Sequence, residues 1–132
     1  MTHGPTAEII LVVDDDNSIR EMIEVILCGA GYHVLTAEDG FEALRLARST
    51  PRVDLLVSDL EMPRMRGDEL ATEFACLYPA VPVLFVTSST GPIKTSVPFE
   101  FHTKPFTVLE LRNCVRRALR SRSALPQISH AV

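Results

Sequence analysis

The feature that most constrains this chain is a regular alternation of short apolar runs with longer segments of helical period. The run Ile9–Val13 is apolar at every position, which is typical of a strand buried on both faces of a parallel sheet. Because strands that alternate with helices form parallel sheets covered on both faces, the pattern predicts an α/β fold. Strands are expected at residues 8–13, 33–37, 54–58, 81–86 and 99–103.

Four helices are predicted from apolar residues that recur three and four positions apart. These residues are Ile19, Met22, Ile23, Ile26 and Leu27 in the first helix, Ala43, Leu44 and Ala47 in the second, Leu70, Phe74 and Leu77 in the third, and Val108, Leu111, Val115 and Leu119 in the last. Asn17 or Ser18 is suited to cap the first helix, and Gly29 and Gly31 are suited to end it. The tail 123–132 lacks the period and is expected to fray.

The segment between the fourth and fifth strands departs from the alternation. Residues 89–98 contain the pair Gly91-Pro92, a second proline at Pro98 and few helix-forming residues. One helical turn at most fits between the two prolines, since proline disrupts a helix interior. We therefore expect a fourth connecting helix to be reduced or missing.

Composition narrows the class of protein. With 132 residues, of which 46% are hydrophobic, the chain is expected to form one globular domain, and its net charge of −4 argues against nucleic acid binding. No apolar run approaches the roughly 20 residues of a membrane span, and no signal peptide is evident at the start, so we expect a cytoplasmic protein. Cys28, Cys76 and Cys114 lack the spacing of a zinc site and are expected to be reduced core residues.

Polar residues follow the carboxyl ends of the predicted strands, which is where ligands bind in open α/β sheets. They are Asp14, Asp15 and Asp16 after the first strand, Asp59 after the third, Thr87 and Ser88 after the fourth, and Lys104 after the fifth. Two carboxylates about 4 Å apart repel by about 4 kcal/mol at an effective dielectric of 20. Lys104 neutralises part of such a cluster, and oxygen-only ligands suit Mg²⁺ as the remaining cation.

Four motifs, in this order, resemble the response-regulator receiver family over residues 8–121. They are Ile10-Leu11-Val12-Val13-Asp14-Asp15-Asp16, Ser58-Asp59-Leu60-Glu61-Met62-Pro63 with Gly67, Val86-Thr87-Ser88, and Lys104-Pro105-Phe106. The resemblance implies a flavodoxin-like, doubly wound, five-stranded parallel sheet in the order 2-1-3-4-5, here with its fourth helix reduced or missing. It also implies signalling through a phosphorylated aspartate.

The resemblance gives each site residue an expected role. Asp59 matches the phosphoacceptor, and Asp15 the direct ligand of a Mg²⁺ ion that Asp14 binds mostly through water. The backbone carbonyl of Glu61 would be a further ligand. The side chains of Glu61 and Ser89 lie where the family tunes the rate at which water attacks the phosphoaspartate.

Further roles fall on the fourth and fifth strands. Thr87 resembles the switch hydroxyl that moves to the phosphoryl group, and Lys104 the lysine that pairs with a phosphoryl oxygen. The bond Lys104-Pro105 resembles the family's cis peptide. Asp16 is either a further acid of the site or a cap at the start of the first helix, and Phe101 is either a switching aromatic or a core residue.

Four apolar residues occupy places where the family docks the helix that bears the phosphorylated histidine. They are Ile19, Met22, Pro105 and Phe106. Core packing explains Ile19 and Met22 equally well, because periodicity does not separate the two uses. With the fourth helix in doubt, we expect output through the first helix, the last helix and the loop after Asp59.

The implied function is that of a stand-alone response regulator. The receiver domain would span 8–121, with flexible termini at 1–7 and 122–132. A sensor histidine kinase or a histidine phosphotransfer protein would phosphorylate Asp59, and a downstream protein would then bind, with no direct contact to DNA or membrane. The alternative is a receiver-fold interaction module or phosphate sink without regulated output.

Three other classes are weaker matches. A haloacid-dehalogenase-type phosphatase needs a further acidic pair after its lysine, and only Glu110 follows Lys104. A non-phosphorylated pseudo-receiver would not be expected to keep Asp14, Asp15, Asp59, Thr87 and Lys104 together. A flavodoxin-like cofactor binder would need a Gly/Ser/Thr-rich phosphate loop after the first strand. The chain is accordingly not expected to be an enzyme, beyond catalysing its own phosphotransfer and dephosphorylation.

Overall fold

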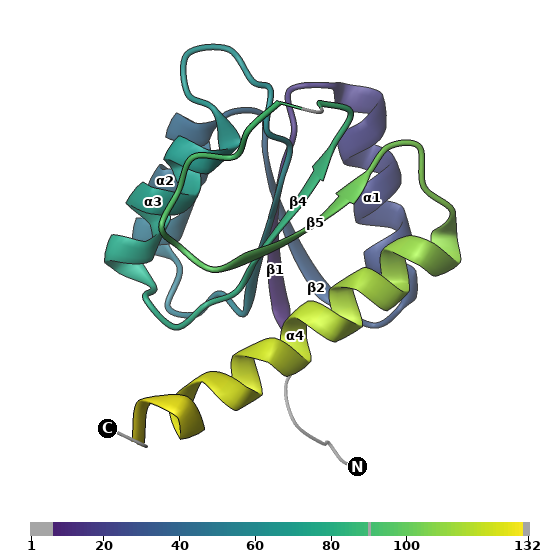
Figure 1. Cartoon of the computed structure of the whole chain (residues 1–132). Coiled ribbons are helices and arrows are strands. Elements are labelled where there is room, and N and C mark those ends of the chain that lie inside the picture. Colours follow the sequence, from purple (N-terminus) through teal and green to yellow (C-terminus); the bar gives the residue numbers. More distant parts are fainter. Residues whose placement is uncertain (1–6, 90, 131–132) are drawn as a thin grey trace.

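The structure, a computed structural model, describes residues 7–89 and 91–130, with residues 122–130 described by their backbone alone. Its strands are β1 (Ile9–Val13), β2 (His33–Ala37), β3 (Leu55–Ser58), β4 (Val83–Thr87) and β5 (Phe99–Thr103). They form one parallel sheet in the order β2-β1-β3-β4-β5 (Figure 1). The predicted flavodoxin-like α/β fold and its strand order are confirmed.

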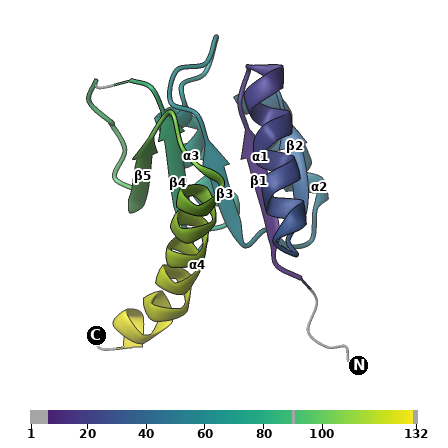
Figure 2. The same cartoon turned by 90° about the vertical axis from the view of Figure 1, so that its right-hand side faces the viewer.

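Helices cover both faces of the sheet. They are α1 (Asn17–Gly29), α2 (Gly40–Ser49), α3 (Gly67–Leu77) and α4 (Val108–His130). Helices α2 and α3 lie on one face and α1 and α4 on the other (Figures 1 and 2). Successive residues of a strand point to opposite faces, so Leu11 and Val13 pack toward α2 and α3, whereas Ile10 and Val12 pack toward α1 and α4.

The sequence offers three candidate caps for α1, namely Asp16, Asn17 and Ser18. Asp16, rather than Asn17 or Ser18, is the capping residue, and its carboxylate accepts the backbone N–H groups of Ser18 at 2.9 Å and Ile19 at 3.1 Å. An aspartate is as good a cap as asparagine or serine, so the choice depends on where the backbone leaves its extended conformation. Of the two roles considered for Asp16, the structure shows the cap.

The connection from β4 to β5 contains no helix in its described residues, as predicted. It passes beside α3 on its way back to the edge strand (Figure 1). Ile93 and Val97 are partly buried against the core that α2 and α3 share. These two apolar side chains thus pack on the core in place of the apolar face of a helix.

The last helix is longer than predicted. The backbone of α4 continues to His130, although the apolar period stops at Leu119, so the chain does not leave the helix near residue 121. The predicted flexibility of residues 1–7 and 122–132 stays a prediction, and residues 1–6 and 131–132 lie outside the described residues. No helix in the described part of the chain combines the length and apolar character that crossing a bilayer requires.

The cysteines match the prediction in part. All three are free, but Cys114 alone is buried, whereas Cys28 and Cys76 are exposed. The expectation that all three are core residues was therefore wrong for two of them. Both exposed cysteines lie on the outer sides of amphipathic helices, where a small residue meets little restriction.

Candidate functional site

Three carboxylates meet at the carboxyl ends of β1 and β3. These strands are neighbours, with Val13 in register with Ser58, so the residues that follow them emerge side by side. One carboxylate oxygen from each of Asp14, Asp15 and Asp59 lies within 4.8 Å of the other two. The predicted acids are thus brought together, with Asp14 buried and Asp15 exposed.

Lys104 reaches this cluster from the end of β5. Its Nζ lies 3.0 Å from Oδ2 of Asp14 and 3.6 Å from Oδ2 of Asp59. The Lys104 N–H donates to the carbonyl of Thr87 at 2.9 Å, which continues the β4–β5 pairing past the strand ends. The peptide bond to Pro105 is cis, as the resemblance implied.

The electrostatics of the cluster leave it short of positive charge. Burial raises the pKa of the Asp59 carboxyl above its usual range; the Lys104 ammonium acts against this rise and the Asp14 carboxylate adds to it. Among the described residues, Lys104 is the one cation that pairs with carboxylates of this cluster. The donor set consists of oxygens, and Mg²⁺ binds oxygen ligands about 2.0–2.1 Å away, so that opposite ligands lie about 4 Å apart. The carboxylates fit around one such ion.

Asp14 is held from two sides. Its Oδ1 accepts the N–H of Asp16 at 2.9 Å, and its backbone carbonyl accepts Nη1 of Arg20 at 2.8 Å. Arg20 also donates to the side chain of Asn17 at 2.6 Å. The first turn of α1 thus fixes the buried acid without occupying the oxygen that Lys104 contacts.

The loop between β3 and α3 depends on a glycine. A Cβ at position 67 would lie 2.0 Å from the carbonyl oxygen of Asp59, which no side chain tolerates. Gly67 instead donates its N–H to the carbonyl of Leu60 at 2.9 Å. Within this loop the N–H of Glu61 points at Oδ1 of Asp59, at 3.4 Å. Gly67 therefore allows α3 to begin directly against the backbone of Asp59.

Thr87 is buried at the end of β4. Its hydroxyl oxygen accepts the N–H of Ser89 at 2.9 Å. The hydroxyl thus sits at the edge of the sheet that carries the acids, and it is also the acceptor that shapes the first turn of the β4–β5 connection.

The predicted docking residues border a common pocket of about 440 Å³ between α1 and the chain that follows β5. Met22 is 42% exposed, whereas Ile19 is partly buried against the core. Core packing therefore accounts for Ile19 better than for Met22. Phe101, at 58% exposed, is not a core residue. The pocket is lined by Asp16, Ile19, Met22, Ser88, Lys104, Pro105 and Phe106.

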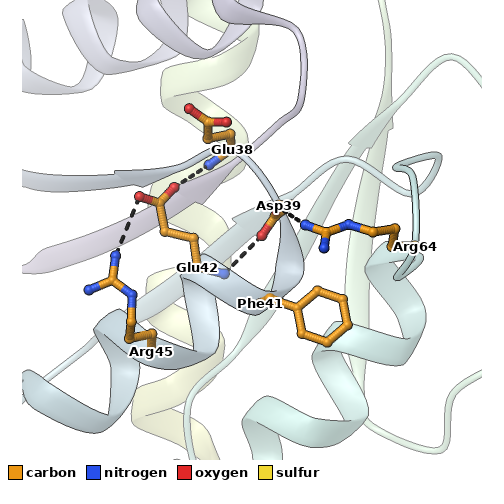
Figure 3. A pocket seen from close by; sticks show the side chains of 6 residues that line it. All are labelled: Glu38, Asp39, Phe41, Glu42, Arg45 and Arg64. Atoms are coloured by element: carbon orange, nitrogen blue, oxygen red, sulfur yellow. Dashed lines mark hydrogen bonds and ion pairs between the residues drawn. The ribbon is translucent and has the colours of Figure 1, made fainter.

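A second, more polar pocket of about 370 Å³ lies beside the start of α2 (Figure 3). Asp39 caps α2 through the N–H of Glu42 at 2.8 Å and pairs with Arg64 at 2.6 Å. The guanidinium of Arg64 also lies 5.0 Å from the centre of the Phe41 ring. Since Arg64 belongs to the loop after Asp59, this pair ties the loop to α2.

The sequence-based predictions missed the ion pairs of this loop. Arg64 pairs with Asp39 and Arg66 pairs with both Glu61 and Asp68. Asp39 lies 25 positions before Arg64, and no hydrophobic period marks such a pair. The acids of the first turn of α3, Asp68 and Glu69, were the one available signal, and they indicate only a helix start.

Comparison with known proteins gives a consistent result. A family model of the response regulator receiver domain matches residues 10–116. The DNA-binding transcriptional regulator NtrC of Escherichia coli is 38% identical over 118 residues, which is 84% of this chain. The chain spans only 24% of the length of such curated relatives.

Solved structures show the same likeness. The Vibrio cholerae chemotaxis protein CheY4 superposes with a TM-score of 0.77 at 34% identity, over 85% of this chain and 98% of that protein. The receiver domain of the hybrid histidine kinase CckA superposes with a TM-score of 0.73 at 33% identity, over 84% of this chain and 98% of that domain.

Proposed function

Because this chain belongs to the response regulator receiver domain family, we propose that Asp59 accepts a phosphoryl group in a Mg²⁺-dependent reaction. The chain is a receiver domain of two-component signalling, a phosphoacceptor domain rather than a conventional enzyme. The observation that carries the assignment to Asp59 is the carboxylate cluster of Asp14, Asp15 and Asp59 with the Lys104 ammonium 3.6 Å from Asp59.

In the proposed reaction a carboxylate oxygen of Asp59 attacks the phosphorus of a phosphohistidine. A P–O bond forms while the P–N bond breaks, and its electron pair returns to the imidazole nitrogen. Negative charge spreads over the equatorial oxygens in the transition state. The Lys104 ammonium is placed to contact one of them, and its present partners, Asp14 and Asp59, keep it at that point.

Asp14, Asp15, Asp59 and the backbone carbonyl of Glu61 would hold the Mg²⁺ ion. When bound, the ion supplies the positive charge that a phosphoryl group needs among three carboxylates. The cluster's shortage of cations supports this assignment. Of the three carboxylate ligands, Asp15 is the exposed one and is accessible to an ion from solvent.

The switch would act through Thr87. A phosphoryl group on Asp59 adds about −1.5 to −2 charges and three strong acceptors to the site. The Thr87 hydroxyl donates to this group only if it turns toward Asp59, and that turn perturbs its bond with the Ser89 N–H. The start of the β4–β5 connection would then move with it.

The phosphodonor would be a sensor histidine kinase or a histidine phosphotransfer protein. Ile19, Met22, Pro105 and Phe106 border a pocket that adjoins Lys104, so an apolar helix seated there would bring its histidine to the site. The downstream partner would be a further protein, and neither DNA nor a membrane is proposed to bind this domain directly. A cytoplasmic location stays a prediction.

The test is a mass measurement after incubation with Mg²⁺ and acetyl phosphate. Wild type is expected to gain one phosphoryl group, and Asp59→Asn none. Addition of EDTA is expected to remove the gain. A wild type that stays unmodified would favour an unphosphorylated interaction module, and a phosphorylated Asp59→Asn would place the acceptor elsewhere.

We further propose that the domain acts without an attached output domain, in the manner of a single-domain regulator. Its likeness to CheY4 extends over nearly all of that protein, which supports this. An immunoblot of source cells tests it: a species of the length of this chain is expected, and a much longer one would contradict it.

The β4–β5 connection, which has no helix in its described residues, favours one alternative, a phosphate sink without regulated output. A sink should lose its phosphoryl group quickly, and we propose that the Glu61 side chain influences that rate. Loss of phosphate from phosphorylated wild type and Glu61→Ala, followed by mass, tests this influence. Equal rates would exclude it.

A further inference from the structure

The guanidinium of Arg66 joins three parts of the structure. Its Nε and Nη2 bind the two carboxylate oxygens of Asp68 at 3.1 and 3.2 Å. Its Nη1 binds Oε2 of Glu61 at 2.9 Å, and its Nη2 also donates to the carbonyl of Pro92 at 3.3 Å. Arg66 thus connects the loop after Asp59 to α3 and to the β4–β5 connection.

Asp68 makes this arrangement rigid. It is 1% exposed, and besides Arg66 it accepts the N–H groups of Lys94 at 2.9 Å and Glu69 at 3.0 Å. A two-pronged guanidinium–carboxylate pair fixes orientation as well as distance. The pair with Asp68 therefore fixes the position of the remaining nitrogen, Nη1, and this nitrogen in turn fixes where the Glu61 carboxylate is bound.

The contact between Arg66 and Glu61 matters because Glu61 lies close to Asp59. Glu61 is two residues beyond Asp59, and its N–H lies against Oδ1 of that residue. Its carboxylate, however, is bound to Arg66, and the described carboxylate cluster consists of Asp14, Asp15 and Asp59 without it. The Glu61 side chain is 57% exposed, and among the described residues the polar partner of its carboxylate is Arg66.

We propose that Arg66 is a positioning residue for phosphotransfer, because it holds the Glu61 carboxylate away from Asp59 and so prevents a fourth negative charge from facing the incoming phosphodonor. This inference rests on the proposed function of Asp59. Phosphodonors are anions, and an unrestrained carboxylate near the site repels them. Arg66 acts through Glu61 and does not itself contact the reacting atoms.

The experiment measures the rate of phosphorylation of the full chain by acetyl phosphate and Mg²⁺. Arg66→Ala is expected to slow it by about threefold to tenfold at low salt, the size of one additional exposed charge near the site. Adding Glu61→Gln to Arg66→Ala is expected to restore the rate of phosphorylation to within about twofold of wild type. The deficit of Arg66→Ala should shrink in 1 M salt, where the Debye length is about 3 Å.

Arg64→Ala is the matched control. Arg64 lies two residues earlier on the same loop and pairs with Asp39, so its loss changes the charge of the loop equally without releasing Glu61 (Figure 3). Its rate is expected within about twofold of wild type. If Arg64→Ala slows the reaction as much as Arg66→Ala, and Glu61→Gln corrects both alike, overall charge is the cause and the proposal is overturned.

A purely structural role for Arg66 is also separable. If Arg66→Ala stays slow when Glu61→Gln is added, Arg66 braces α3 rather than positions Glu61, and the proposal is overturned. Should Arg66→Ala fail to fold because the buried Asp68 carboxylate has lost its cationic partner, Arg66→Ala/Asp68→Asn removes that charge and carries the same comparison. If wild type takes no phosphate at all, the proposed function of Asp59 has failed, and the inference with it.

Discussion

The two sides of the site are held in different ways. On the acidic side, β1 and β3 are buried central strands, and the first turn of α1 fixes Asp14. On the basic side, Lys104 follows β5, an edge strand with alternating exposure, and the connection before it has no helix in its described residues. There, polar contacts from Arg66 and Asp68 replace helix packing.

This difference shows that the charged and hydroxyl groups of the site come from residues at the ends of the strands. Asp14, Asp59, Thr87 and Lys104 reach one edge of the sheet because their strands are parallel neighbours. A connecting helix contributes none of these groups. The acids and the lysine therefore meet although the described residues of the β4–β5 connection form no helix, and hydrogen bonds from Arg66 and Asp68 hold that connection instead.

The largest effect is expected when the contact between the basic side and the acidic side of the site is removed. Lys104→Met removes the one ammonium that contacts both Asp14 and Asp59, and the rate of phosphorylation is expected to fall about 10²-fold or more. Lys94→Met, the same change on the exposed β4–β5 connection, is the control and should have little effect. Equal rates in both variants would remove Lys104 from the site.

A second prediction compares two acids that pair with arginines of the same loop. Asp68→Ala removes a buried acceptor of the Lys94 and Glu69 N–H groups and should lower the free energy of unfolding by about 2–3 kcal/mol. Asp39→Ala removes the α2 cap and should cost about 1 kcal/mol. Urea denaturation measures both. A larger loss of unfolding free energy in Asp39→Ala than in Asp68→Ala would mean that Asp68 does not anchor the β4–β5 connection.

The pH dependence sharpens this prediction. Burial raises the pKa of Asp68, but hydrogen bonds from Arg66 and from the Lys94 N–H outweigh it and hold the pKa below its usual range. A lowered carboxyl pKa stabilises the fold above the unfolded-state pKa of about 3.9, and this stability is lost as pH falls through the folded pKa. The difference in unfolding free energy between wild type and Asp68→Asn should be constant above about pH 5 and vanish in acid. A difference that grows in acid would contradict the sign.

The smallest effect concerns the first turn of the β4–β5 connection. Thr87→Val removes the acceptor of the Ser89 N–H, and hydrogen exchange at that amide should accelerate about fivefold, as for the loss of one hydrogen bond near 1 kcal/mol. The Asp16 N–H, which donates to Asp14 on the acidic side, is the reference and should not change. Unchanged exchange at Ser89 would show that Thr87 does not organise this turn.

Much of this architecture could be predicted from the sequence. The bounds of β2 and β5 agree with the prediction. The prolines of the β4–β5 connection indicated a reduced or missing helix, and the described residues of that connection contain none. Strand periodicity is a local property, and the parallel sheet then places every strand end at one edge. The meeting of Asp14, Asp15 and Asp59 follows from those two facts.

The contacts that could not be predicted are those between residues distant in the chain. Asp68 and Lys94 are 26 positions apart, and neither the hydrophobic period nor the turn signals report that pair. The choice of Asp16 over Asn17 and Ser18 as the cap of α1 could not be made from the sequence, because the three adjacent residues suit it equally. The continuation of α4 to His130 was missed because backbone hydrogen bonds can extend a helix beyond its apolar stripe.

A calorimetric titration of the unphosphorylated protein with Mg²⁺ tests the central claim most directly. The account predicts saturable binding of one ion to wild type, weakened at least about tenfold by Asp15→Asn, which removes one charge from the oxygen ligands. A wild type that binds no Mg²⁺, or an Asp15→Asn variant that binds it equally well, would contradict the claim that acids from separate strand ends form one cation site beside Asp59.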